Sequence, residues 1–368
     1  MGRLNTLLAA VCTAVAASCG GSGGGGGPAE IEGLPHRTLE VTGRIGIELG
    51  DSNCVFSAVR GAVFTTDGRI VVSDVGTFSL RSYTPTGEFL HRGGRRGEGP
   101  GEYTMPACLT ACPGGGVVVS DFGSSKLIFY DSTLTLHHEV TGIVEGVPGD
   151  LVVLPDSAIV GSVREFDRST GSAGYSVRRW EPGKSESSTI YMMSMQQVDR
   201  SNPRAMFRAT QVVFAAAPDG RVFVSVPSTE KYLIECYSPD GTPLRSIERA
   251  FEPVERSEED LLMEREMMAS IFESRGMPGM IDEWEPERYC TAIADLDVSG
   301  GLIWARRGTE AIPFYDVYDL DGNPLFTCSA PELPYYQLVA VVPGDSLFLA
   351  YEADPEDYPV VHILEYAE

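Results

Sequence analysis

The residues with the most evident chemical potential lie in the glycine-rich segment 93–102, GGRRGEGPGE. Backbone N–H groups of such a loop could hold a phosphate, but the Gly-Lys-Ser/Thr that brings a cation and a hydroxyl to the phosphate is missing. Pro100 and Pro106 also argue against a helix after the loop. We therefore interpret it as a connection between strands. Arg92, Arg95 and Arg96 are expected to pair with surface carboxylates or, as the alternative, to grip an anionic ligand.

Aspartates form a second candidate set. Asp74 and Asp121 end the β-branched runs IVVSD and VVVSD, where a carboxylate can accept hydrogen bonds from N–H groups of the following turn. Calcium binding or catalysis at these two positions is the alternative. Asp150, Asp295 and Asp297 interrupt otherwise apolar runs and are candidates for contacting a ligand.

Cysteines and histidines give weaker signals. Cys108-x3-Cys112 resembles half a zinc site, but no second pair of ligands accompanies it, and we predict no metal there. In an extended strand these two residues would lie about 13 Å apart, too far for a disulfide. An even number of cysteines in an exported chain indicates disulfides, whose connectivity stays open. The six that follow the export signal are Cys54, Cys108, Cys112, Cys236, Cys290 and Cys328.

The overall charge excludes two classes of partner. The 28 Lys and Arg residues against 52 Asp and Glu give a net charge of −24. Nucleic acids and anionic membrane surfaces both need a basic face, so neither is an expected partner. Because 43% of the residues are hydrophobic, the chain can still bury a large core.

The N-terminus carries an export signal. Residues 1–18 contain one Arg and a short apolar run, too short to span a bilayer. Ala16-Ala17-Ser18-Cys19 resembles a bacterial lipoprotein signal, in which Cys19 is lipidated after cleavage. The glycine-rich residues that follow predict a tether over 19–37. An ordinary cleaved signal is the alternative. No Asp follows Cys19, so we favour the outer over the inner membrane.

A repeat organises the rest of the chain. Six times, a turn of Asp, Gly, Pro or Ser precedes a short β-branched strand, beginning at Ile70, Val117, Ile159, Val222, Leu302 and Leu347. An apolar run precedes each turn, and after most of the strands an aromatic residue leads into another turn. Two hairpins of this kind make four antiparallel strands, which is one blade of a β-propeller. The interval between the strand starts Ile159 and Val222 is long and is expected to hold loops near 165–175 and 185–205. The interval between Val222 and Leu302 is also long and is expected to hold an insertion.

We therefore predict an all-β fold, a six-bladed propeller over residues 38–368. The last repeat lacks one strand, and the segment 38–49 belongs to no repeat, so this N-terminal strand should close the last blade. A helical insertion is predicted over 253–288, between blades four and five. It begins with a capping-box-like Ser257-Glu258-Glu259-Asp260 and stops at Gly276. Its methionines pack on their own domain or, as the alternative, form an adaptable binding surface.

The segment 70–103, IVVSDVGTFSLRSYTPTGEFLHRGGRRGEGPGEY, resembles the NHL repeat. The chain as a whole looks like the six-bladed propeller lipoproteins of environmental bacteria. That resemblance implies a fold and an exported location but no single activity, because propellers host many.

The innermost strand of each blade lines the channel, and enzyme chemistry needs groups there. We place these strands near 58–65, 107–112, 149–154, 209–217, 291–298 and 336–342. They contain no His, and their carboxylates are Asp150, Asp295 and Asp297. We therefore favour a binding or scaffold module for an envelope or extracellular protein, peptide or glycan, without a cofactor. The alternative is a metal-dependent lyase or lactonase-type hydrolase using Ca or Zn.

Overall fold

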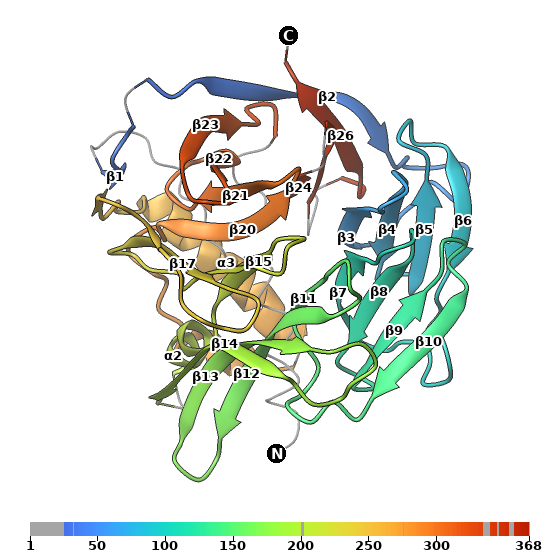
Figure 1. The fold of residues 1–368 in the computed structure, drawn as a ribbon, viewed down its shortest axis with the longest axis horizontal. Coiled ribbons are helices and arrows are strands. Elements are labelled where there is room, and N and C mark those ends of the chain that lie inside the picture. The colour runs from blue at the N-terminus through green and yellow to red at the C-terminus, as the bar shows by residue number, and fades with distance from the viewer. Residues whose placement is uncertain are drawn as a thin grey trace.

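The computed structural model describes residues 26–31, 33–199, 202–274, 276–333, 339–343, 346–352 and 357–367. Its sheets stand around a central axis like the blades of a propeller (Figure 1). Four sheets contain four antiparallel strands each, in chain order, and a fifth sheet contains eight strands. The prediction of an all-β propeller with four-stranded antiparallel blades is confirmed.

The strands follow the predicted repeat closely. In the first separate sheet, β3 to β6 are Val59–Phe64, Ile70–Asp74, Ser79–Tyr83 and Phe89–Gly93. In the second, β7 to β10 are Pro106–Ala111, Val117–Asp121, Lys126–Tyr130 and Leu136–Thr141. In the third, β11 to β14 are Asp150–Val153, Ile159–Asp167, Ser172–Trp180 and Thr189–Gln197. In the fourth, β15 to β18 are Val213–Ala216, Val222–Ser225, Tyr232–Tyr237 and Ile247–Arg249.

The eight-stranded sheet has the order β20-β21-β22-β23-β2-β26-β25-β24. Its first four strands are Ile293–Ser299, Leu302–Arg307, Phe314–Asp319 and Pro324–Ser329. Its other four, in the same order, are His36–Ile45, Val361–Tyr366, Phe348–Glu352 and Val339–Pro343.

The N-terminal strand β2 joins the two ends of the chain. From Leu39 to Ile45 it pairs antiparallel with β26, as predicted for the strand that completes the last repeat. Its first three residues also pair in parallel with β23, which was not predicted. With ten residues, β2 is long enough to reach both neighbours. The structure therefore has four separate blades and one continuous eight-stranded sheet where two further separate blades were expected.

Aromatic residues at the ends of third strands fill the outer part of the blades. In all four separate sheets the aromatic lies opposite the first residue of the second strand, as in Ile70 with Tyr83 and Val117 with Tyr130. These side chains are almost completely buried, Tyr83 at 0% exposure and Trp180 at 2%. The repeated aromatic of the sequence thus has a packing role, because a blade must widen away from the axis.

The predicted insertion is helical. Helix α3 (Glu258–Ser274) and the 3₁₀ helix η1 (Pro278–Ile281) lie between β19 (Phe251–Glu252) and β20. Ser257 and Asp260 exchange backbone-to-side-chain hydrogen bonds, both 3.1 Å, which is the predicted capping box. At the other end, Gly276 has φ +72°, and the Met277 N–H donates to the Phe272 carbonyl at 2.9 Å. This is a Schellman stop.

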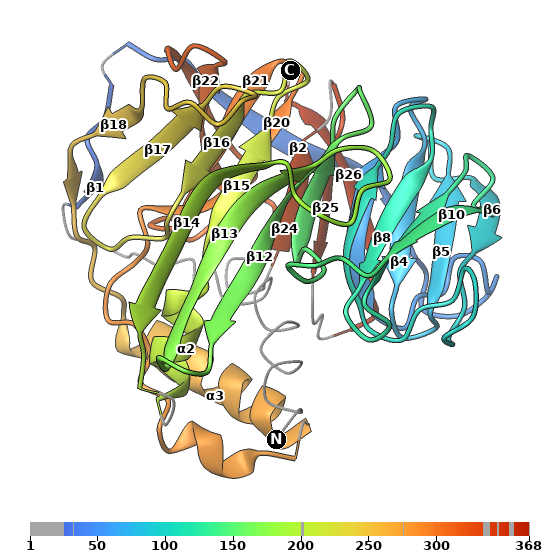
Figure 2. The ribbon, with the colours of Figure 1, turned by 60° about the horizontal axis from the view of Figure 1, so that its bottom comes forward.

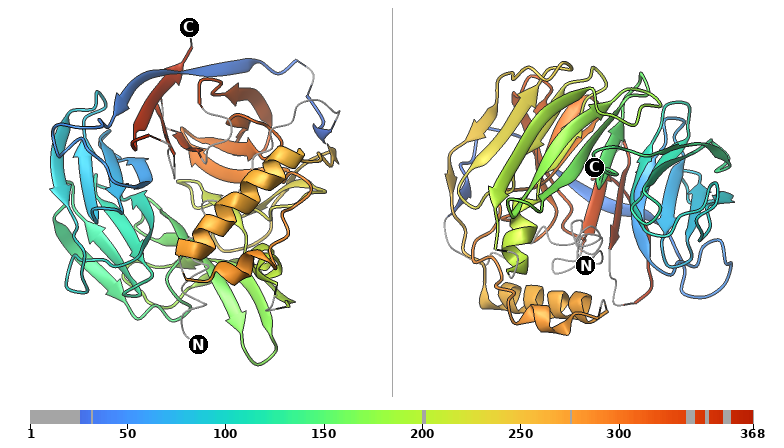
Figure 3. Two further views of the ribbon diagram at one scale, coloured as in Figure 1. Left: turned by 180° about the vertical axis from the view of Figure 1, so that it is seen from behind. Right: turned by 90° about the horizontal axis from the view of Figure 1, so that it is seen from below.

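Helix α3 crosses one face of the propeller, together with the short helix α2 (Pro203–Ala209), which the sequence analysis missed (Figures 2 and 3). Met268 is buried against Phe207, Phe272 and Trp284, so the methionine stripe packs on its own domain. Glu264 of the same helix is buried although it is charged. Its side chain is 4% exposed, because nearby arginines provide its counter-charge.

The tether is shorter than predicted. β1 (Gly27–Pro28) pairs with β19, and Glu30 forms an ion pair with Arg307 at 2.8 Å. The ring of His36 stacks on Phe314, with 5.5 Å between centroids. Residues from Gly26 onward therefore contact the propeller instead of forming a free linker. Cys19 and the signal segment lie outside the described residues.

Two further expectations are corrected. The segments expected as long loops near 165–175 and 185–205 contain regular structure, because β12 and β13 form a hairpin of two nine-residue strands, and β14 and the start of α2 fall in the second segment. Polar residues such as those in REFDRST hid the alternation that marks a strand. Cys54, Cys108, Cys112, Cys236 and Cys328 are free thiols, so within the described chain no disulfide joins any two of the six predicted cysteines. Among the described residues, no helix combines the length and apolar character needed to cross a membrane.

Candidate functional site

The first strand of each of the four separate blades, together with β20 and β24, faces the central axis (Figure 1). These strands contact one another around the axis, for example β3 with β7 and β15 with β20. They overlap the segments in which the sequence predicted channel-lining strands. The carboxylates on them come from two blades, Asp150 from β11 and Asp295 and Asp297 from β20.

The three aspartates are close enough for their charges to affect one another. Residues two apart in a strand point to the same face, about 7 Å from each other, which applies to Asp295 and Asp297. Burial, together with the charges of Asp295 and Asp150, raises the pKa of Asp297 to about 7. Burial likewise raises the pKa of Asp295 to about 6, although the Arg306 guanidinium lowers it. Asp150 and Asp295 are nevertheless exposed to solvent, and Asp297 is partly exposed, so water reaches all three side chains.

Asp150 has a thiol as its partner. The Cys108 Sγ donates to Asp150 Oδ1 at 3.4 Å, and the Leu151 N–H donates to the same oxygen at 2.9 Å. Burial raises the pKa of Asp150 in spite of these hydrogen bonds. Burial also raises the pKa of the Cys108 thiol, and the neighbouring carboxylate adds to this effect. Cys108 is therefore held as a neutral thiol rather than as a nucleophilic thiolate.

A tyrosine and an arginine complete the cluster. The Tyr351 hydroxyl donates to the backbone carbonyl of Arg60 at 3.3 Å. Burial raises the pKa of Tyr351, the charges around Cys108, Asp295 and Asp150 raise it too, and Arg60 opposes them. Besides Arg306, which pairs with Asp295 across β20 and β21, one further cation, one phenol, one thiol and three carboxyl groups lie on strands from different sheets around the axis. We name the six residues Arg60, Cys108, Asp150, Asp295, Asp297 and Tyr351 the channel cluster.

This arrangement can bind a cationic group or exchange protons near neutral pH. Carboxylates with raised pKa values attract a cation that neutralises them, and pairs of carboxyl groups with separated pKa values are what general acid–base catalysis uses. In the described chain, no three or more His, Cys, Asp or Glu side chains are gathered so that they could hold one metal ion. The channel cluster therefore does not fit a calcium or zinc centre as it stands.

Asp74 and Asp121 lie at strand ends, where they organise turns. Asp74 is fully buried and accepts hydrogen bonds from the N–H groups of Ser57 and Ala58 and an ion pair from Arg81 at 3.0 Å. Asp121 is also fully buried and accepts hydrogen bonds from the loop before β7 and from the turn after β8. Both carboxylates hold the loop that enters their own blade, so the hydrogen bonds reach further back along the chain than predicted.

The three arginines proposed as an alternative ligand site are not in the channel. Arg92 is on the outermost strand of its sheet, and Arg95 and Arg96 follow in the connection to the next blade. Arg95 pairs with Glu102 at 2.6 Å, and the Arg96 guanidinium lies over the Phe78 ring at 5.2 Å. The glycine-rich segment then leads into strand β7, without a helix.

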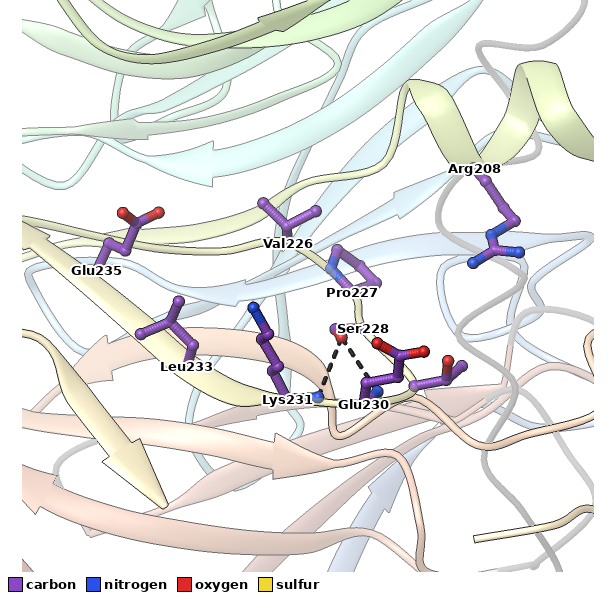
Figure 4. A pocket seen from close by; sticks show the side chains of 9 residues that line it. Arg208, Val226, Pro227, Ser228, Glu230, Lys231, Leu233 and Glu235 are labelled. Carbon is purple, nitrogen blue, oxygen red and sulfur yellow. Dashed lines mark hydrogen bonds between the residues drawn. The ribbon is translucent and has the colours of Figure 1, made fainter. Parts of the chain in front are cut away.

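A separate pocket of about 440 Å³ lies on the rim beside α2 (Figure 4). Its charged lining residues have both signs, Arg208 and Lys231 against Glu230 and Glu235. The Ser228 hydroxyl accepts hydrogen bonds from the N–H groups of Glu230 and Lys231, both 3.1 Å. Arg208 pairs with Glu287 at 3.1 Å. The sequence analysis did not point to this pocket.

Sequence reasoning missed half of the channel cluster. Arg60 lay within a predicted channel strand, so its charge could have been noticed as the partner of the aspartates. Cys108 was considered for metal binding and disulfides, not for a hydrogen bond to a carboxylate. Tyr351 is the last residue but one of β25, and no local pattern indicates that it lies near the aspartates.

No protein-family model matches the chain, and no curated protein matches it. Solved propellers resemble it in fold. A candidate exported protein of Bacteroides fragilis aligns with a TM-score of 0.49 and 12% identity, covering 90% of this chain and 99% of that one. Regucalcin, a calcium-binding protein of Agrobacterium tumefaciens, aligns with a TM-score of 0.46 and 13% identity, covering 90% of this chain and 96% of that one. Aldose sugar dehydrogenase of Streptomyces coelicolor aligns with a TM-score of 0.49 and 12% identity, covering 89% of this chain and 98% of that one. At these identities no activity is carried over.

Proposed function

We propose that this chain is an exported six-bladed propeller that binds a basic segment of a peptide or protein in its channel. The eight-stranded sheet counts as two blades, because its two halves each have four strands and share only the short β2–β23 pairing. Six blades placed around an axis leave a narrow channel, which is where the channel cluster lies. An NHL-like ancestry is part of this proposal and rests on the repeat of residues 70–103.

The observation that supports the binding role is the meeting of Asp150, Asp295 and Asp297 on two blades. Burial is the largest cause of the raised pKa values of Asp295 and Asp297, and repulsion from the neighbouring carboxylates adds to it. A lysine, an arginine or an N-terminal amine entering the channel would remove that repulsion. The favourable binding energy would therefore come largely from neutralising charges that the fold already holds close together.

The test is calorimetric titration with a lysine-containing hexapeptide and its acetyl-lysine counterpart. We expect the charged peptide to bind at least tenfold more tightly at pH 8, and Asp295→Asn with Asp297→Asn to abolish the difference. Binding should weaken at pH 5, where the carboxyl groups hold protons. A matched control is Glu266→Gln on the exposed side of α3. Equal affinity for the two peptides would reject the basic-segment proposal.

A specific observation also supports a second function, a lyase or lactonase-type hydrolase. Asp297 with a pKa of about 7 and Asp295 with a pKa of about 6 could serve as general acid and general base. Hydrolysis of a panel of lactones and esters, lost in Asp297→Asn but kept in Glu266→Gln, would favour this function. Stoichiometric Ca or Zn in the purified protein, lost in the same aspartate variants, would favour its metal-dependent form.

The location in the envelope is likewise a proposal. Lipidation of Cys19 would anchor the protein to the membrane. The acyl chains would supply the membrane affinity, because a folded domain this acidic is repelled by anionic lipid. Cys19→Ala is then expected to move the protein from the membrane to the soluble fraction. Separation of the inner from the outer membrane would test our preference for the outer membrane. The idea fails if mass spectrometry of the wild-type protein finds an unmodified N-terminus.

A further inference from the structure

Strand β14 (Thr189–Gln197) is the outer edge of its sheet, and no described strand pairs with its free side. It is nine residues long and contains no charged residue, Pro or Gly. Met193 is 54% exposed, Met195 36% and Ile190 48%. A long, uncharged and partly apolar edge is a template for a further strand, and soluble proteins usually protect such edges.

The other free outer edges in the described part of the chain are protected. β6 carries His91 and Arg92, β10 carries Glu139 and two histidines, and β18 has only three residues, two of them charged. The eight-stranded sheet has no free outer edge, because β2 lies between β23 and β26 and pairs with both. β14 therefore differs from every equivalent edge in length and in charge.

The charge of the chain decides which partner fits this edge. Two copies with a net charge of −24 each repel one another, and the repulsion is smallest when the contact itself carries no charge. β14 offers such a place, since a strand without charges meets its own copy without opposing like charges. Two identical strands also pair antiparallel about a two-fold axis, which makes a closed and self-complementary interface.

The register of that pairing follows from the strand. Tyr191 lies at an irregularity of the β13–β14 pairing and contacts the neighbouring blade through the Pro239 carbonyl at 3.2 Å. The regular part is therefore Met192–Gln197, centred near Ser194. With the two-fold axis at Ser194, Met193 lies opposite Met195 of the second copy. Residues two apart share a face, so four methionine side chains meet on one side of the joined sheet.

From these observations we infer that β14 is the dimerisation edge of the protein and that its occupant is a second copy of this chain. The two blades then form one continuous eight-stranded sheet across the interface. Added salt strengthens the dimer, because it screens the repulsion between the two acidic domains but leaves the uncharged contact unchanged. This inference does not depend on the ligand of the channel.

Sedimentation equilibrium of the purified chain tests the inference. The wild-type protein is expected to dimerise in the micromolar range, more tightly in 0.5 M than in 0.1 M NaCl. Met193→Lys with Met195→Lys places like charges opposite one another and should weaken the dimer at least tenfold. Met193→Glu with Met195→Glu should do the same. An equimolar mixture of the two variants should dimerise again, because Lys at one position then faces Glu at the other.

The control is Leu262→Lys, which adds a charge at a residue of α3 that is 56% exposed. It should dimerise like the wild-type protein, and circular dichroism should show all variants to be folded. A monomeric wild-type protein over the whole concentration range overturns the inference. It is also overturned if the lysine variant dimerises like the wild type, if the mixed variants stay monomeric, or if β14 binds another protein's peptide instead of a second copy.

Discussion

At the scale of single residues, Asp297 makes the protein sensitive to pH. Its pKa is about 7 in the folded chain against an ordinary value of 3.8. Between these values the folded chain binds more protons than the unfolded chain, so the free energy of unfolding falls as the pH rises from about 4 to about 7. We expect Asp297→Asn to remove this loss and to stabilise the protein at pH 8 by on the order of 1 kcal/mol, since channel water moderates the cost of the charge.

Urea unfolding at pH 4 and pH 8 measures this effect. The variant should differ little from the wild type at pH 4, where Asp297 is protonated in the folded chain and nearly half protonated in the unfolded chain. Glu266→Gln should change stability equally little at both pH values. An equal stabilisation by Asp297→Asn at pH 4 and pH 8 would contradict the assigned cause.

Asp74 and Asp121 occupy equivalent places but should differ in their contribution to stability. Removing Asp74 leaves the buried Arg81 without its carboxylate, whose Oδ2 lies 3.0 Å from the Arg81 Nη2. Asp121 accepts hydrogen bonds mainly from backbone N–H groups and a serine hydroxyl. We expect Asp74→Ala to cost about 3–5 kcal/mol, as for a broken buried ion pair, and Asp121→Ala about 1–3 kcal/mol. Equal losses in chemical denaturation would show that Arg81 finds another partner.

At the scale of elements, Glu264 holds the helical insertion together. Its carboxylate accepts hydrogen bonds from Arg204 and from the Trp284 indole, both 3.0 Å, and from Arg256. Glu264→Ala should therefore loosen α3 from α2 and η1, costing about 3 kcal/mol. Hydrogen exchange should accelerate about 100-fold in residues 258–274 but not in the blades. Glu266→Ala on the exposed side of the same helix is the control, and equal acceleration by both variants would contradict this role.

The elements also show what a single sequence can predict. Strands such as β4 and β8 were predictable because a tight turn and a β-branched run are local features, and so were both ends of α3. The parallel pairing of β2 with β23 and the burial of Glu264 were not. Both depend on residues hundreds or tens of positions away, His36 with Thr327 and Glu264 with Arg204. In the channel, the aspartates were predictable from strand position, whereas Tyr351 was not.

At the scale of the whole molecule, the ring is closed by a strand from the opposite end of the chain. Leu39 of β2 is 1% exposed and lies in a core cluster with Phe326 and Phe348. Ile45, near the other end of the same strand, is 2% exposed and lies in a different cluster with Phe56 and Tyr83. One strand thus connects the cores on both sides of the last blade, so its loss should be felt by the entire propeller.

The last prediction tests this closure. Leu39→Ala should cost about 2–5 kcal/mol through the cavity that it leaves, while Leu49→Ala, at a residue 84% exposed, should cost less than about 0.5 kcal/mol. Removing residues 36–45 should have a larger effect, because the edges of β23 and β26 would then be free to pair with other chains. Light scattering should detect aggregation of this deletion below the unfolding temperature of the wild type. A soluble deletion variant with unchanged stability would contradict this role of β2. The ring would then be held closed by the packing between the blades alone.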